Sequence, residues 1–435
     1  MLNHFRLSLA PRALALALAL STFLHIASAY DCSAHPWVDE AVKHWFKPAY
    51  KMARTSPLTV EQSLGKIANI TWGDYFTGKS MGILYYNQPT KAYKVRWQLL
   101  WKHNEPHKPA GMQQLMERAV AAHGADLAAA WGPGKEVKFI FGTEDFPITW
   151  PDQQLRVPSF QMCASPESPD VPVPDFTWEK YNQAQYTNTS WWEVKRLLTH
   201  KAKMVPWRLR EREMFMRGDA GVGYRKTLMP LMHEVQVNRS DIALFGVRVN
   251  FHTTGFYVTD MKHFSLLDNW CHRRYLVHTS GFSYSASLKY KLACGAVVIS
   301  FESKFREFYY PGLKPGVHYI SVPEVERDEL LKTVAPRLKK ELTEMEQKYT
   351  EEPPPMAVAA REFATSQLSP DALSCYWYRT LLAYGRLYLS EKASDVPEEV
   401  ELPAMAGGRR RQLQRSAAAA LRLGRALLLG DDEGS

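Results

Sequence analysis

The sequence predicts an α/β fold, because strand-like and helix-like segments alternate through its second half. Short apolar runs at 273–281, 296–301 and 317–322 are each followed by a helical pattern, and the last precedes the long helical segment 325–350. Such alternation is typical of a parallel sheet with helices packed on it. The chain has 435 residues, a length that suits two domains of ordinary size.

In the first half, helical spacing occurs at 60–67 and 111–131. The apolar run 136–142 (EVKFIFG) is bounded by turn residues and predicts a buried strand. Proline-rich irregular chain follows it. A helix is then expected over 189–204, and after it a strand that ends at Arg217.

In the second half, helices are expected over 225–235, 284–294 and 304–313, with a further strand over 242–251. A proline-rich linker at 351–356 precedes two amphipathic helices. The chain therefore divides into parts that we list by residue number: a signal peptide (1–29), an N-terminal domain (30–205), a C-terminal domain (206–350), closing helices (351–394) and a disordered basic tail (395–435).

The N-terminus carries the features of a secretory signal peptide. Two arginines precede the apolar stretch ALALALALSTFLHI, and ASA at 27–29 is a small-residue cleavage site. A retained signal anchor is the alternative, but the apolar run is short for a membrane span, and no later segment is apolar enough to cross a bilayer. Three sequons begin at Asn69, Asn188 and Asn238. The five cysteines contain no CxxC, and in an oxidising compartment they predict two disulfides and one spare thiol.

Composition and missing motifs exclude several functions. The formal charge is +9, but the segment 408–430 alone holds six arginines and no acid, so the body does not indicate a nucleic-acid partner. The sequence has no GxxxxGK[ST] loop, no GxGxxG and no GxSxG. HNEPH at 103–107 has the wrong spacing for a zinc helix. The body has no Asp-x-Asp pair to hold a metal-bound diphosphate, so we expect no metal and no other cofactor.

Ligands of α/β sheets bind at the carboxyl ends of strands, so the residues that follow each strand are the candidates. The first candidate is an acid, Asp145. The others are two arginines with two neighbouring residues, and a hydroxyl-rich helix start with a lysine and a further acid: Arg217, Gly218, Asp219, Arg225, Ser287, Lys289 and Glu307. Arginines beside a helix start predict an anion site, and a carboxylate opposite could act as general base. Each candidate also has a purely structural explanation. Asp145 could shape a turn, the arginines could form surface ion pairs, and Lys289 could be solvated.

Several separated segments together resemble the protein O-glucosyltransferase family, which includes Rumi and the capsule-associated xylosyltransferases. The longest is 273–322 (RRYLVHTSGFSYSASLKYKLACGAVVISFESKFREFYYPGLKPGVHYISV). MFMRGD, EDFP, DVPVPDFTW and SPDALSCYWYRTLLAYGRL are similar to other family segments and occur in the family's order, so the resemblance covers about residues 66–393.

The resemblance implies a GT-B fold, in which two Rossmann-like domains face a cleft and the final helices cross back to the first domain. It also implies inverting, metal-free transfer of a sugar from a UDP-sugar to a hydroxyl of a protein or glycan. Asp145 matches the catalytic base, and Asp175 and Trp178 belong to the acceptor-side segment. The donor would be bound by Arg217, Gly218, Asp219, Arg225, Ser287, Lys289 and Glu307, with Glu307 on ribose hydroxyls. The pairs Cys271–Cys294 and Cys32–Cys375 resemble family disulfides, which leaves Cys163 free.

Two positions depart from the family pattern. Asp219 stands where the animal enzymes have serine, and Ser287 stands where they have an arginine. Plant-like members of the family resemble this chain in lacking that arginine. Loss of that arginine is expected to weaken diphosphate binding by about 1.5–3 kcal/mol if no other cation replaces it. The donor sugar, glucose, xylose or another pentose, therefore stays open.

We expect a monomer of the secretory pathway. Because GDDEGS is not a KDEL-type signal, the lumen of the endoplasmic reticulum, the Golgi and secretion are all expected alternatives. The alternative is a catalytically silent relative that binds glycans or folding clients. The presence of both Asp145 and Arg225 favours the enzyme.

Overall fold

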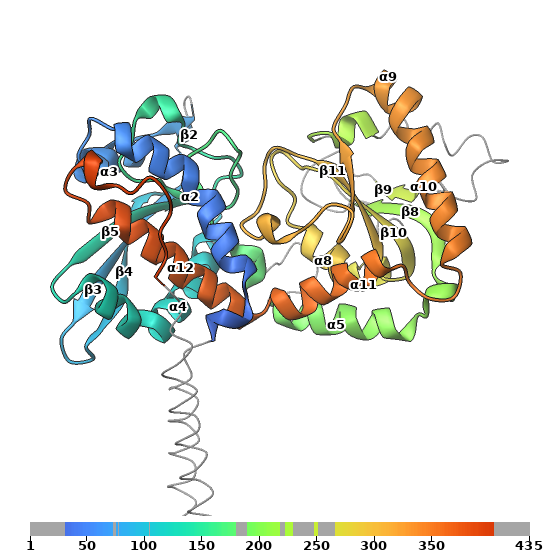
Figure 1. The fold of residues 1–435 in the computed structure, drawn as a ribbon, viewed down its shortest axis with the longest axis horizontal. Coiled ribbons are helices and arrows are strands. Elements are labelled where there is room, and N and C mark those ends of the chain that lie inside the picture. Colours follow the sequence, from blue (N-terminus) through green and yellow to red (C-terminus); the bar gives the residue numbers. More distant parts are fainter. Residues whose placement is uncertain are drawn as a thin grey trace, which may run out of the picture.

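The computed structural model shows two lobes, each built around one β-sheet (Figure 1). It describes residues 31–72, 75–76, 78–103, 105–179, 189–217, 222–228, 248–250 and 266–403. Several sequence-based predictions lie outside these residues: the signal peptide, Asn188, Gly218, Asp219, Asn238 and the chain from 404 onward. Within the described residues, no helix is both long and apolar enough to cross a membrane.

The sheet of the second lobe is parallel throughout its described strands. Its order is β12-β11-β10-β8-β9, and the strands are β8 (Glu211–Arg217), β9 (Arg248–Asn250), β10 (Arg273–His278), β11 (Val297–Glu302) and β12 (Ile320–Pro323). The side chains of β10 and β11 are almost all buried, as expected for strands covered on both faces. This confirms the parallel α/β arrangement predicted for this half of the chain.

Helices cover both faces of this sheet. They are α5 (Trp191–Met204), α7 (Leu267–Trp270), α8 (Leu288–Ala293), α9 (Arg327–Glu329), α10 (Ala335–Lys348) and α11 (Pro355–Glu362), with a π-helical turn at Leu330–Val334. The predicted disulfide Cys271–Cys294 is present and joins the ends of α7 and α8. The helix α5, just before the predicted boundary at 205, packs against α7 and α8 of the second lobe and against the turn Phe176–Trp178 of the first. On its apolar face Trp191 contacts Tyr290 of α8.

The first lobe has a mixed sheet of order β4-β3-β5-β6-β7. Its strands are β3 (Lys79–Asn87), β4 (Ala92–Trp101), β5 (Glu136–Gly142), β6 (Phe160–Gln161) and β7 (Val171–Pro172), and a small ribbon is formed by β1 (Thr71–Trp72) and β2 (Tyr75–Phe76). The strand β3 is antiparallel to both of its neighbours, β4 and β5, whereas β5, β6 and β7 run parallel to one another. The architecture as a whole is α/β and consistent with two Rossmann-like domains of GT-B type.

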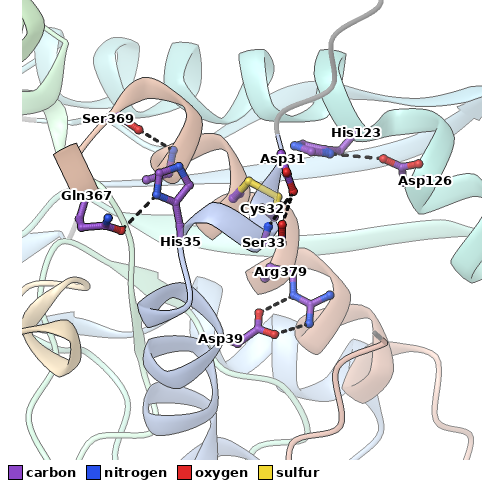
Figure 2. Close-up of a disulfide and its surroundings, with 12 residues drawn as sticks. Asp31, Cys32, Ser33, His35, Asp39, His123, Asp126, Gln367, Ser369 and Arg379 are labelled. Carbon is purple, nitrogen blue, oxygen red and sulfur yellow. Dashed lines mark hydrogen bonds and ion pairs between the residues drawn. A yellow bond between two sulfur atoms is a disulfide. The ribbon is translucent and has the colours of Figure 1, made fainter. Parts of the chain in front are cut away.

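The closing helices cross from the second lobe back to the first, as predicted (Figure 1). The helix α11 packs on α8 and β11, whereas α12 (Pro370–Tyr388) packs on α2 (Trp37–Thr55) and α4 (His107–Trp131) of the first lobe. The remaining helix of this lobe, α3 (Val60–Ala68), packs against β5. Figure 2 shows how α12 is fastened: the predicted disulfide Cys32–Cys375 forms, and Asp39 accepts two hydrogen bonds from Arg379, at 2.6 and 2.7 Å.

Two predictions of local structure are wrong. Residues 304–313 do not form a helix; only a short 3-10 turn, Tyr310–Gly312, occurs, because Pro311 interrupts the pattern. Residues 395–403 are not a disordered tail. Val396 and Val400 are buried, and the Pro403 carbonyl accepts a hydrogen bond from Arg379 at 2.7 Å.

Candidate functional site

The predicted base, Asp145, lies in the first lobe just after β5. The loop that carries it is held on both sides: the Gly78 amide donates to Glu144 at 3.0 Å, and Thr143 pairs with His103 at 2.6 Å. The Asp145 side chain is 47% exposed, and the Lys108 ammonium lies 3.7 Å from its carboxylate. Burial of the surroundings raises the pKa of Asp145, and Lys108 opposes this by stabilising the ionised form. A basic carboxylate that still reaches solvent suits proton abstraction.

A segment of the second lobe, Ser283–Ser287, meets Asp145 directly. The Ser283 hydroxyl donates to the backbone carbonyl of Asp145. The next residue, Tyr284, donates from its hydroxyl to Asp175 at 2.6 Å, so the same segment also reaches the predicted acceptor-side region. A backbone bridge between Ala164 and Arg306 joins the lobes nearby. The acid of the first lobe is therefore fixed against the hydroxyl-rich segment of the second.

Arg225 lies beside this segment. Its guanidinium donates to Ser285 at 3.3 Å, and the Ser285 and Ser287 hydroxyls are 2.9 Å apart. Gly223 makes this approach possible: its φ of +53° favours glycine, and a Cβ there would lie 2.0 Å from the Gly281 carbonyl oxygen. The backbone of Arg217 ends strand β8 and pairs with Asn250.

The structure places the other predicted donor residues differently, in the core between the lobes. Lys289 is fully buried, and its ammonium donates to Thr177 of the first lobe at 2.6 Å, 4.7 Å from the ring of Trp178. Trp178 is itself fully buried, so its ring offers no exposed face to an acceptor. Asp175 is buried too, accepting from Tyr284 and capping the turn Phe176–Trp178. Lys289 is therefore neither solvated nor part of the Arg225 cluster.

Glu307 completes this buried group. Burial raises its pKa to about 8, and the positive charge of Lys289 opposes the rise. Oε2 accepts a hydrogen bond from Tyr309 at 3.0 Å, while Oε1 is buried and has no hydrogen-bond partner within the described chain. A buried carboxyl oxygen without a partner is uncommon in folded proteins and marks a place where a ligand hydroxyl would be favourable.

Sequence reasoning missed four polar residues of the site: Lys108, Ser283, Tyr284 and Lys291. Lys291 lies one turn after Ser287 on α8 and is buried. Its ammonium donates to Ser287 at 2.9 Å. The run of hydroxyls in FSYSASLKY singles out the two segment residues, but no local pattern in the sequence distinguishes these lysines from solvated ones.

The cysteines and the described sequon have simple surroundings. Cys163 is free and buried, and its thiol donates to the Asp145 carbonyl at 3.1 Å. His123 lies close enough to Cys32 and Cys375 to suggest a metal group, but both sulfurs are in a disulfide and neither can be a thiolate ligand (Figure 2). Asn69 is exposed at the end of α3, so the glycosylation predicted there is sterically possible.

The two-lobed α/β fold, in which Asp145 of one lobe is joined to the hydroxyl-rich segment of the other, is that of a GT-B-like protein. The chain belongs to glycosyl transferase family 90, whose model matches residues 129–421, more than half of its length. This agrees with the family resemblance predicted from the sequence.

Curated relatives carry matching names at low identity. The chain is 23% identical over 262 residues to protein O-glucosyltransferase 1 of Homo sapiens, covering 58% of this chain and 62% of the relative. It is 26% identical over 254 residues to the O-glucosyltransferase rumi homolog of Anopheles gambiae (57% and 61%). For O-glucosyltransferase rumi of Drosophila melanogaster the values are 22% over 265 residues (58% and 61%). The chain thus matches about three fifths of the length of each.

Proposed function

We propose that this protein transfers glucose or xylose from a UDP-sugar to a hydroxyl of a protein or glycan, with inversion and without a metal, in the secretory pathway. The observation that carries the proposal is the contact between the lobes at Asp145. Its backbone carbonyl accepts from Ser283, in the same segment whose Ser285 accepts from Arg225. Family membership supports sugar transfer in general. The two disulfides and the exposed Asn69 support an oxidising compartment.

The chemistry needs one displacement. The acceptor oxygen attacks the anomeric carbon while its proton moves to Asp145, and the bond from that carbon to the β-phosphate oxygen breaks. Negative charge grows on the departing UDP, where Arg225 and Arg217 would stabilise it. Cationic side chains can perform this role without a metal, as the family resemblance implies.

Glu307 and Lys289 would support the donor from the buried side. With a pKa of about 8, Glu307 is mostly protonated at neutral pH and can either donate to or accept from a ribose hydroxyl. Lys289 holds Thr177, and with it the capped turn behind Asp175. We assign Lys289 to positioning because its ammonium is enclosed.

A donor screen tests the proposal. Calorimetry with UDP-glucose, UDP-xylose and UDP should show binding, and one sugar donor should be hydrolysed or transferred at an undiminished rate in the presence of EDTA. Activity abolished by the chelator would contradict the metal-free mechanism. Binding without turnover of any UDP-sugar would identify a silent relative instead.

We expect Lys108→Gln to move the acidic limb of the pH–rate profile to higher pH. Lys108 lowers the pKa of Asp145, so its removal raises that pKa, and the base becomes protonated at a higher pH. Measurement of kcat/KM between about pH 5 and 9 checks this. Lys108→Arg, which keeps the charge, should retain the wild-type limb. An unchanged limb in Lys108→Gln would show that Asp145 does not set it.

A further inference from the structure

A second buried lysine on α8, Lys291, lies beneath the hydroxyl segment. Its ammonium donates to Ser287 at 2.9 Å and lies 3.3 Å from Nδ1 of His278. The ring of Trp270 is 5.6 Å away. Within the part of the chain that the structure describes, no carboxylate lies within ion-pairing distance of this ammonium. Burial, and after it the positive charge of Arg225, lower the pKa of Lys291 well below its usual value, and a bound anion would favour the charged form.

The charged form of Lys291 can only donate hydrogen bonds. Beside it Nδ1 of His278 accepts, and in that tautomer Nε2 carries the proton and donates to Tyr310, 3.0 Å away. Burial and the neighbouring charge of Lys291 lower the pKa of His278, which agrees with a neutral ring. Lys291 is thus held in place from behind, with Ser287 in front.

The two serine hydroxyls in front of Lys291 must offer a proton outward. Ser287 accepts from Lys291, and Ser285 accepts from Arg225 at 3.3 Å. One of the two hydroxyl protons lies in the bond between the serines, which are 2.9 Å apart. Neither cation can accept the other proton, so it is directed away from both. Both serines are half-buried and reach the surface.

We propose that Lys291 acts through Ser287 as the second cation for the donor diphosphate, in place of an arginine at position 287. Arg225 and the outward hydroxyl contact the phosphate oxygens, and Lys291 is a positioning residue that polarises Ser287 from below. This rests on the proposed function and names the charge that balances the diphosphate. It also explains how a serine can occupy position 287 in an active enzyme.

The test compares UDP with uridine, which lacks the diphosphate, by calorimetry on the full chain. Lys291→Met should weaken UDP binding about tenfold and leave uridine binding unchanged. Ser287→Ala should give a similar loss, and the double variant should lose little more than either, because both act through one contact. In the Lys291→Met background, Ser287→Arg should restore UDP binding. The KM for the UDP-sugar should follow the same order, with a smaller effect on kcat.

Lys79→Met is the matched control. Lys79 is another fully buried lysine, in the first lobe, where its ammonium donates to the carbonyls of Ala68 and Ile70. Its loss should leave UDP binding unchanged. Equal UDP affinity in wild type and Lys291→Met would overturn the inference, as would a parallel loss of uridine binding. Failure of the wild type to bind UDP would instead overturn the proposed function.

Discussion

Replacement of Asp145 by asparagine should reduce sugar transfer by about 10²–10⁴-fold and leave UDP affinity within a factor of a few. Asparagine keeps the shape of the side chain but cannot take the acceptor proton. The backbone carbonyl of Asp145, which accepts from Ser283 and Cys163, is unaffected by the change, so the contact between the lobes should persist. Single-turnover transfer rates and calorimetry with UDP would separate chemistry from binding.

Asp152→Asn is the control, since Asp152 is an exposed aspartate of the same proline-rich region, in the short turn Pro151–Gln153. It should transfer at the wild-type rate. If Asp145→Asn retained most of the activity, another group would have to be the base. If it lost UDP binding in parallel with activity, Asp145 would have a structural role, and the assignment of the base would fail.

The middle of the parallel sheet could be predicted because β10 and β11 are buried on both faces. Continuous apolar runs such as 296–301 depend little on their neighbours, and the strand predicted over 136–142 is found as Glu136–Gly142. The hairpin of β3 and β4 escaped prediction. The side chains of β4 are mostly half-buried or exposed, so its pattern is weak without the partner strand.

Aromatic spacing produced the wrong helix at 304–313. Phe308 and Tyr309 are both fully buried, but they pack against Trp178 of the first lobe in a turn conformation. Burial of this kind gives a helix-like spacing whenever a loop fills a contact between lobes, and local periodicity cannot separate the two. Pro311 was the one local signal against a helix.

The site was only partly accessible from sequence for a related reason. Asp145 and Arg225 follow strands, so the position rule for α/β sheets finds them. Lys289 and Lys291 lie two residues apart on α8. The ammonium of Lys289 donates to Thr177, whereas that of Lys291 donates to Ser287. The helical sequence alone gives neither direction, since the neighbours come from the opposite lobe in one case and from the preceding segment in the other.

Removal of the disulfide Cys32–Cys375 by double alanine substitution should lower the free energy of unfolding by about 4–5 kcal/mol, because it closes a very long loop. The two cysteines are 343 residues apart, and the whole second lobe lies between them. Removal of Cys271–Cys294, which are 23 residues apart, should cost about 2 kcal/mol less, since the entropy of loop closure grows with the logarithm of loop length. Urea unfolding of both variants, with Cys163→Ala as the variant without a lost bridge, measures the difference.

The fold itself should survive the loss of Cys32–Cys375, which makes the comparison measurable. The helices α2 and α12 stay joined by the Asp39–Arg379 pair at 2.6 and 2.7 Å and by the hydrogen bond from Tyr50 to the Ala383 carbonyl at 3.0 Å (Figure 2 shows the former). Because these contacts act in the native state and the disulfide acts on the unfolded chain, their contributions should add. Equal destabilisation by the two disulfide variants would show that native packing around the bridges, and not loop length, determines their effect.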